Sequence, residues 1–123
     1  MVLWDTGVPC ISPWGSGAAD CSASSVTDGN WHFIALTYET EQAQLYVDGA
    51  LKVTRSRTYA TMLTGTIDIG GIIDPPIPYA GLVDEVAIFN RALSANEIGA
   101  IYNAGSAGIC AVKTIYLPLI LRN

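Results

Sequence analysis

The acidic side chains and the single histidine of this chain have the chemistry that catalysis would need. A retaining glycosidase, for example, holds two carboxyl groups about 5 Å apart on either side of the bond that it cleaves. Glu39 and Glu41 lie at an expected turn. Asp84 and Glu85 are neighbours on an expected strand, so their side chains point to opposite faces of a sheet. Neither pair can flank one glycosidic bond, and the sequence therefore predicts no catalytic residue.

His32 could act as a general base in a triad with a serine and an aspartate. A lone histidine at the start of a strand is more often packed or capping, and we interpret His32 in that way. It cannot build a zinc site with Cys10, Cys21 and Cys110, which lack C-x-x-C spacing and a nearby histidine. In an exported protein, one cysteine pair could close a disulfide and leave a third thiol free or bound to another chain. Alternatively, the cysteines are buried structural thiols.

Asp84 is the carboxylate with the most unusual expected surroundings. The segment 82–89 reads as a strand, in which Asp84 shares one face with aliphatic side chains. A carboxylate in such a place needs hydrogen-bond donors, a cation or a raised pKa. Asp84 could accept hydrogen bonds from backbone amides or from Arg91, or it could ligate a metal ion.

Two aspartates that are each followed by glycine mark tight turns. Asp28 precedes the apolar run 31–39, and Asp48 lies between the expected strands 44–47 and 51–55. An Asp-Gly pair between apolar strands is the strongest short hairpin signal. Both aspartates could be metal ligands, but an aspartate in a turn commonly bonds its own backbone, and we assign them that role.

The remaining expected elements are a short strand, a proline-rich loop and one helix. Residues 66–69 alternate between polar and apolar side chains, which predicts a strand. Three prolines exclude the loop 73–78 from any central strand, because proline donates no ladder hydrogen bond. Ser94 and Glu97 form a Ser-x-x-Glu capping box, which predicts a helix from 95 to about 103.

Aromatic side chains could stack on sugar rings, but they are also good strand residues that bury large areas. We expect Trp31 and Tyr46 to pack in the core. Tyr79 follows the proline-rich loop, and loops of this kind often border a binding face. Tyr79, together with Asp74 of that loop, is therefore the candidate ligand-binding site.

Three motifs together indicate a known family. They are D-G-N-W-H at 28–32, Y-V-D-G at 46–49 and D-E-V-A-I-F-N-R-A-L-S at 84–94. In pattern and order, residues 26–108 resemble the C-terminal half of a laminin-G-like, or concanavalin A-like lectin/glucanase, domain. The resemblance implies an all-β fold, an antiparallel jelly-roll sandwich of which this chain holds only a part, with one short helix near its C-terminal end.

The resemblance also carries expectations about ligands and function. Related jelly rolls often carry a structural calcium ion near this region, which makes Asp84 a candidate ligand and Ca²⁺ the candidate cofactor. The family works mostly outside the cell, which implies a non-catalytic recognition module that binds carbohydrate or a surface glycan. Two alternatives remain: a fragment of a glycoside hydrolase whose E-x-D-x-x-E strand lies upstream, or a purely structural or adhesive module.

Composition excludes several other classes of protein. A net charge of −5 leaves no basic surface that could follow a phosphate backbone, so nucleic acid is not an expected partner. Apolar residues at 50% and charged residues at 14% exclude a disordered chain, and no apolar stretch is long enough to span a bilayer. With 123 residues, the chain is one domain at most.

We divide the chain into a loop-rich segment 1–25, with a short strand near 2–4, a half-domain 26–108 and an apolar tail 109–123. The tail resembles the Y-L-P-L-I-x-R endings of some exported bacterial proteins. The start MVLWDTGVPC lacks the features of a signal peptide, so we expect a fragment of an exported protein that works outside the cell or on its surface. The open edges and apolar face of half a jelly roll would favour a homodimer.

Overall fold

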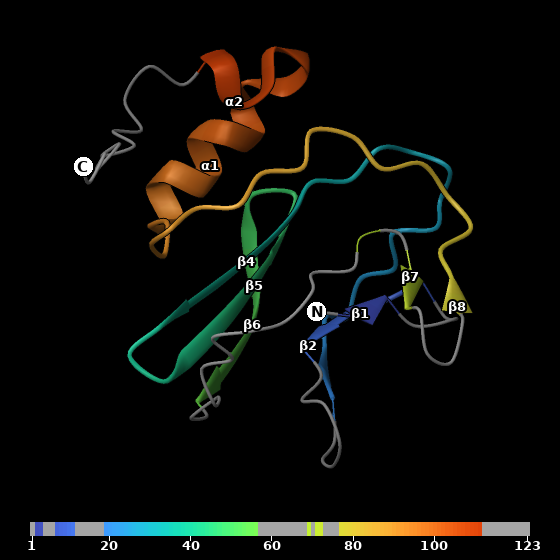
Figure 1. Ribbon diagram of the computed structural model, residues 1–123, viewed down its shortest axis with the longest axis horizontal. Coiled ribbons are helices and arrows are strands. Elements are labelled where there is room, and N and C mark those ends of the chain that lie inside the picture. The colour runs from blue at the N-terminus through green and yellow to red at the C-terminus, as the bar shows by residue number, and fades with distance from the viewer. Residues whose placement is uncertain are drawn as a thin grey trace, which may run out of the picture. The chain divides into compact units, whose positions relative to one another are not determined.

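The computed structural model describes residues 2–3, 7–11, 19–56, 69, 71–72 and 77–111, whose elements are drawn in Figure 1. The chain divides into two compact units. The first unit combines Met1–Thr58 with Phe89–Asn123, and the second is Tyr59–Ile88. The expected antiparallel β architecture with a short helix is confirmed, and most of it belongs to the first unit.

A three-stranded antiparallel sheet forms the centre of the first unit. It consists of β4 (Ile34–Glu39), β5 (Gln42–Val47) and β6 (Ala50–Ser56) in that order. These are the strands that the sequence predicts, within a few residues at each end. We refer to them as the central sheet.

Both turns of the central sheet have two residues with positive φ. The values are 52° and 74° at Asp48 and Gly49, and 49° and 62° at Thr40 and Glu41. Two positive φ angles match the right-handed twist of the flanking strands, so the predicted Asp-Gly hairpin is confirmed. Gly49 is needed for a second reason, because a Cβ there would lie 2.8 Å from the ring of Tyr102. Thr40 is β-branched, which makes its positive φ unfavourable.

The N-terminal part of the chain forms a second antiparallel sheet. Its strands are β1 (Val2–Leu3), β2 (Pro9–Ile11) and β3 (Asp20–Cys21), in the order β1-β2-β3. The strand expected near residues 2–4 is confirmed at β1. The strands β2 and β3 lie in a stretch that we expected to be mainly loop, because two or three residues are too few to show a periodicity.

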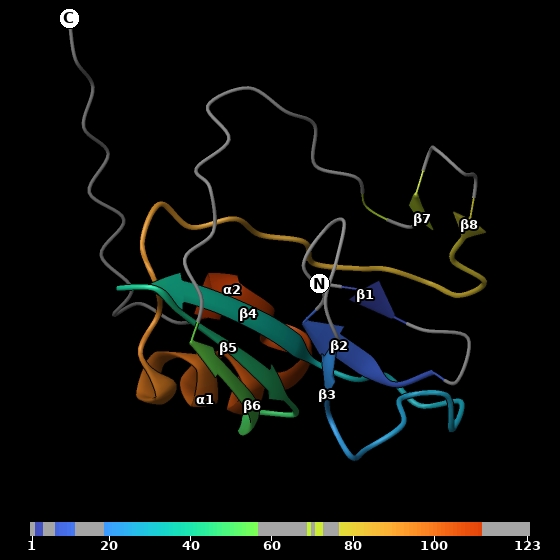
Figure 2. The same cartoon turned by 90° about the horizontal axis from the view of Figure 1, so that it is seen from below.

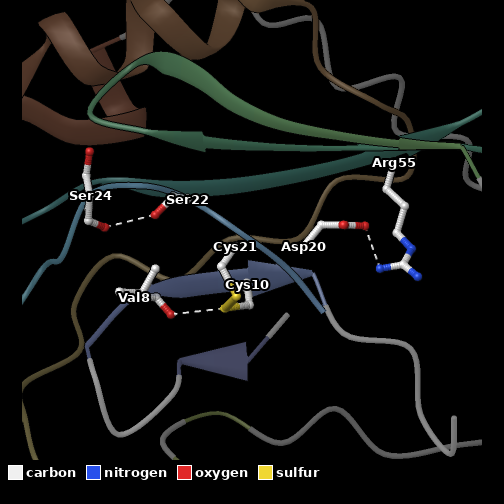
Figure 3. Close-up of a disulfide and its surroundings, with 7 residues drawn as sticks. All are labelled: Val8, Cys10, Asp20, Cys21, Ser22, Ser24 and Arg55. Atoms are coloured by element: carbon white, nitrogen blue, oxygen red, sulfur yellow. Dashed lines mark hydrogen bonds and ion pairs between the residues drawn. A yellow bond between two sulfur atoms is a disulfide. The ribbon is translucent and has the colours of Figure 1, made fainter. Parts of the chain in front are cut away.

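A disulfide and an ion pair stabilise this N-terminal sheet (Figure 3). Cys10 and Cys21 are opposite each other in the register of β2 and β3 and are joined by a disulfide. This confirms the disulfide alternative for one cysteine pair. Arg55 Nη1 on β6 lies 2.5 Å from Asp20 Oδ2 on β3, which links the N-terminal sheet to the central sheet. The guanidinium of Arg55 is largely buried, so it depends on such a partner.

The predicted helix is observed as α1 (Ala95–Asn103). The hydroxyl of Ser94 accepts a hydrogen bond from Glu97 N at 3.3 Å, and Glu97 Oε2 accepts one from Ser94 N at 2.9 Å, as the predicted capping box requires. Two short elements follow, η1 (Gly105–Ala107) and α2 (Gly108–Ala111). Within the described ranges, no helix has both the length and the apolar character needed to cross a membrane.

Both faces of the central sheet make packing contacts. On one face, Tyr46 packs with Ile98 and Ile101 of α1, so the helix lies against this side (Figure 2). The core position expected for Tyr46 is thereby confirmed. The opposite face contacts β2 and β3 and carries the buried apolar side chains Ala43, Leu45, Val47 and Val53.

In the second unit, β7 (Gly71–Ile72) and β8 (Ile77–Pro78) form a two-stranded antiparallel sheet. The strand predicted at 82–89 is wrong, because these residues belong to no sheet and no helix. Glu85 has a φ of 50°, which is incompatible with a strand. Of the strand predicted at 66–69, only Ile69 belongs to the described residues, and the tail beyond residue 111 lies outside them.

Candidate functional site

His32 joins the two Asp-Gly turns of the first unit. Its Nδ1 lies 2.9 Å from Asp48 Oδ2, and its Nε2 lies 2.9 Å from Asp28 Oδ1. Asp28 Oδ1 also accepts a hydrogen bond from Asn30 N at 2.9 Å. Asp48 Oδ1 accepts one from Phe33 N at 3.0 Å. We term Asp28, His32 and Asp48 the His32 cluster.

The imidazole of His32 lies between two carboxylates, an arrangement that favours its protonated form. Only a protonated imidazole can donate a hydrogen bond from both ring nitrogens. The hydrogen bond to Asp48, followed by the one to Asp28, raises the pKa of His32 above its ordinary value. The amide of Asn30, followed by His32, holds the pKa of the Asp28 carboxyl well below its usual range. Both ring nitrogens of His32 face carboxylates of the two turns, and through these contacts His32 connects the turns.

The turn role assigned to Asp28 is confirmed, whereas the link between the two turns was not predicted. Asp48 bonds residues that precede β4 rather than its own backbone. The register of β4 and β5 explains why Asp48 lies next to the residues that precede β4. Ile34 pairs with Val47, so extending the ladder by one residue brings Phe33 opposite Asp48, and Asp48 N does donate to Phe33 O at 2.8 Å.

A polar groove of about 490 Å³ lies in the first unit, between the central sheet and the start of α1. Thr37, Glu39, Gln42 and Gln44 line it from the sheet, with Thr40 at the turn. The register pairs Thr37 with Gln44 and Glu39 with Gln42, so these side chains share one face of the sheet. Residues 91–95 and Glu97 line the groove from the other side. We refer to this feature as the polar groove.

Thr37 is the most buried polar residue of the polar groove. It is only 7% exposed, and its hydroxyl makes no hydrogen bond with any residue that the structure describes. A buried hydroxyl without a partner is unfavourable, so such a group calls for a water molecule or a ligand. Beside it, Gln44 Oε1 accepts a hydrogen bond from the hydroxyl of Tyr46 at 3.1 Å, which orients the amide and leaves its NH₂ group to donate.

Arg91 and Glu97 form the charged side of the polar groove. Arg91 Nη1 donates to Glu97 Oε2 at 2.9 Å, and Arg91 Nη2 donates to Glu97 Oε1 at 2.5 Å. Ser94 donates to Glu97 Oε2 from its amide and from its hydroxyl, both at 2.9 Å. Arg91 and then Ser94 lower the pKa of Glu97 to about 2. Glu97 therefore remains an ionised, fully engaged carboxylate at neutral pH.

The candidate ligand-binding residues lie away from the polar groove in sequence. Asp74 is outside the described residues. Tyr79 is 39% exposed. Its ring lies against the backbone of Gly81, because a Cβ at Gly81 would come within 2.6 Å of ring atoms. Ligand binding by Tyr79 and Asp74 stays a prediction.

Asp84 is exposed rather than facing a core, so its expected apolar surroundings are wrong. Its Oδ1 accepts a hydrogen bond from Glu85 N at 2.8 Å, which is the backbone alternative named above. Arg91 bonds Glu97 instead. Among the described residues, no group of three or more His, Cys, Asp or Glu side chains is arranged to hold a metal ion. Calcium binding at Asp84 stays a prediction.

The expected core position of Trp31 is wrong. Its side chain is 67% exposed. Trp31 lies in the irregular segment before β4, where strand alternation does not decide which way a side chain points. Phe33, two residues further on, packs against the apolar cluster of Tyr46, Leu93, Ile98 and Ile101 instead.

Comparison with known proteins identifies one family. A laminin-G family model, described as the concanavalin A-like lectin/glucanases superfamily, matches residues 8–99. Among solved structures, residues 221–444 of an S-layer domain-containing protein from Clostridium thermocellum ATCC 27405 match with 23% identity and a TM-score of 0.48. The match covers 76% of this chain and 49% of that one, so the chain spans about half the length of this solved structure. No curated protein matches the chain.

Proposed function

This chain belongs to the concanavalin A-like lectin/glucanase superfamily, and we propose that it is a non-catalytic recognition module that binds carbohydrate in the polar groove. Membership alone does not choose between a lectin and a glucanase. The observation that carries the proposal is Thr37, a buried residue that lines the polar groove and whose hydroxyl has no partner among the described residues. A sugar hydroxyl can both donate to such a group and accept from it.

The other lining side chains support a ligand that is rich in hydroxyl groups. Gln42 and Gln44 can each donate and accept, Arg91 donates, and Glu39 accepts. Sites for small ligands usually measure about 300–1,000 Å³, and the volume of the polar groove, about 490 Å³, lies within that range. The polar groove therefore has room and hydrogen-bonding groups for one or a few sugar units.

The electrostatics support binding rather than hydrolysis. A glycosidase needs one carboxyl group that is protonated at working pH and can donate to the leaving oxygen. Arg91 and Ser94 lower the pKa of Glu97 to about 2 and occupy both of its oxygens. Glu97 cannot supply that proton, and Glu39 alone does not make a catalytic pair.

The proposal includes a location outside the cell or on its surface. The disulfide between Cys10 and Cys21 supports it, because disulfides persist in oxidising compartments and are rare in the cytosol of most organisms. Membership in a superfamily that includes lectins is compatible with the same location.

The experiment is a glycan-array screen followed by calorimetry with two matched variants. Thr37→Val keeps the shape of the side chain and removes the hydroxyl, so we expect about fivefold to tenfold weaker binding. Thr54→Val is the control. Thr54 of β6 is opposite Gln44 of β5 in the register, but it is exposed and does not line the polar groove. Equal losses in both variants, or no bound glycan on the array, would contradict the proposal and favour a structural or adhesive role.

A further inference from the structure

We infer that the polar groove selects neutral sugars over acidic ones, and that Glu39 sets this selectivity. The inference rests on the proposed carbohydrate binding and adds the class of sugar. It follows from the charges that line the polar groove, which are the cation of Arg91 and the carboxylates of Glu39 and Glu97.

The charge of Arg91 is already matched within the chain. Both of its terminal nitrogens donate to the two oxygens of Glu97, the bidentate arrangement that fixes a guanidinium most firmly. An acidic sugar that took the Nη1 and Nη2 hydrogens now bound by Glu97 would have to displace Glu97. Glu97 also caps α1 through Ser94, so displacement would break the helix cap as well.

Arg91 can nevertheless still bind a neutral hydroxyl. A guanidinium carries five N–H donors. One Nη1 hydrogen of Arg91 is donated to Glu97 and the other to the carbonyl oxygen of Ala92. One Nη2 hydrogen is donated to Glu97. The Nε–H and the second Nη2 hydrogen make no bond with a described residue. Arg91 therefore offers donors to a ligand without offering an unmatched positive charge.

Glu39 adds a negative charge to the same groove. It lies at the end of β4, it is exposed, and its carboxylate forms no ion pair within the part of the chain that the structure describes. A carboxylate accepts hydrogen bonds from sugar hydroxyls but repels a second carboxylate or a sulfate nearby. The net charge of −5 of the whole chain acts in the same direction.

The test compares matched pairs of ligands. Each pair is a neutral oligosaccharide bound on the array and the same oligosaccharide with its primary alcohols oxidised to carboxylates. Calorimetry measures both with the wild type, with Glu39→Gln and with Glu41→Gln. Glu41 is the charge-matched control, because it lies in the adjacent turn and does not line the polar groove.

We expect the wild type and Glu41→Gln to bind the oxidised ligand about tenfold more weakly than the neutral one. In Glu39→Gln the difference in affinity between the neutral and the oxidised ligand should fall to about twofold. Added salt should reduce the same difference in the wild type. Equal or tighter binding of the oxidised ligands by the wild type would overturn the inference without contradicting the proposed carbohydrate binding. A difference that stays the same in Glu39→Gln would also overturn it. Absence of binding to every ligand would instead refute the proposed function itself.

Discussion

Replacing Asp48 by asparagine tests how the His32 cluster holds the two turns together. Asparagine keeps the shape of the side chain, tolerates the positive φ of 52° at this position and can still accept the hydrogen bond from Phe33 N. The charge opposite His32 Nδ1 is lost. Asp48→Asn therefore changes the electrostatics of the cluster and little else.

The expected loss of stability in Asp48→Asn depends on how exposed the side chains of His32 and Asp48 are. A hydrogen bond to a charged group contributes about 1.5–3 kcal/mol. The side chain of His32 is 16% exposed and that of Asp48 is 35% exposed, so solvent screens the pair and the lower end of the range applies. We expect the free energy of unfolding to fall by about 1.5 kcal/mol, and the Tm by about 5 °C.

The loss of stability in Asp48→Asn should be larger at low pH than at high pH. The pKa of His32 is raised in the folded state, so its charge stabilises the fold below the unfolded-state pKa of about 6.5. This contribution disappears as the pH rises through the higher folded-state pKa. Urea unfolding should therefore show a larger difference between wild type and variant at about pH 5.5 than at about pH 9.5.

The chain has a single histidine, so NMR can follow its titration without ambiguity. The pKa of His32 should lie above its ordinary value in the wild type and move toward it in Asp48→Asn. Asp84→Asn serves as the control, because it removes a carboxylate that is outside the His32 cluster. An unchanged stability and an unchanged titration in Asp48→Asn would refute the reasoning.

Four further predictions address other parts of the chain. Ser94→Ala should lower the free energy of unfolding by about 1 kcal/mol, because its hydroxyl caps the Glu97 amide, and an unchanged urea midpoint would count against this. Replacing Thr40 and Glu41 by Asn-Gly should raise it by about 1 kcal/mol, because both positions have positive φ, and a lower Tm would contradict that explanation. If Asp84 ligates calcium, millimolar calcium should raise the Tm of the wild type and not that of Asp84→Asn, whereas no shift in either would remove the prediction. We also expect concentration-dependent dimers in sedimentation, because large apolar side chains on β4 and along 82–88 are exposed, and a monomer at all concentrations would disprove this.

Elements encoded by neighbouring residues were predictable from the sequence. The hairpin at Asp48 depends on two adjacent residues that accept positive φ, and the start of α1 depends on Ser94 and Glu97, which are three residues apart. Each of these patterns involves residues that are at most three positions apart in the sequence. The structure confirms both at the predicted positions.

Features that depend on distant residues were not predictable in the same way. The alternation in 82–89 is that of a strand, but a strand also needs a neighbour for its backbone hydrogen bonds, and periodicity does not reveal that neighbour. The polar groove combines Thr37 of the central sheet with Arg91 before α1, which are far apart in sequence. The His32 cluster likewise becomes visible only when the strand register is known.

The most direct test of carbohydrate binding in the polar groove is an NMR titration of the ¹⁵N-labelled chain with the glycan that binds best on the array. The proposal predicts that the largest amide shifts fall on residues of the polar groove, including Thr37, Gln44 and Arg91, while those of the His32 cluster stay unchanged. Shifts centred on Tyr79 in the second unit, or no shift with any glycan, would contradict it.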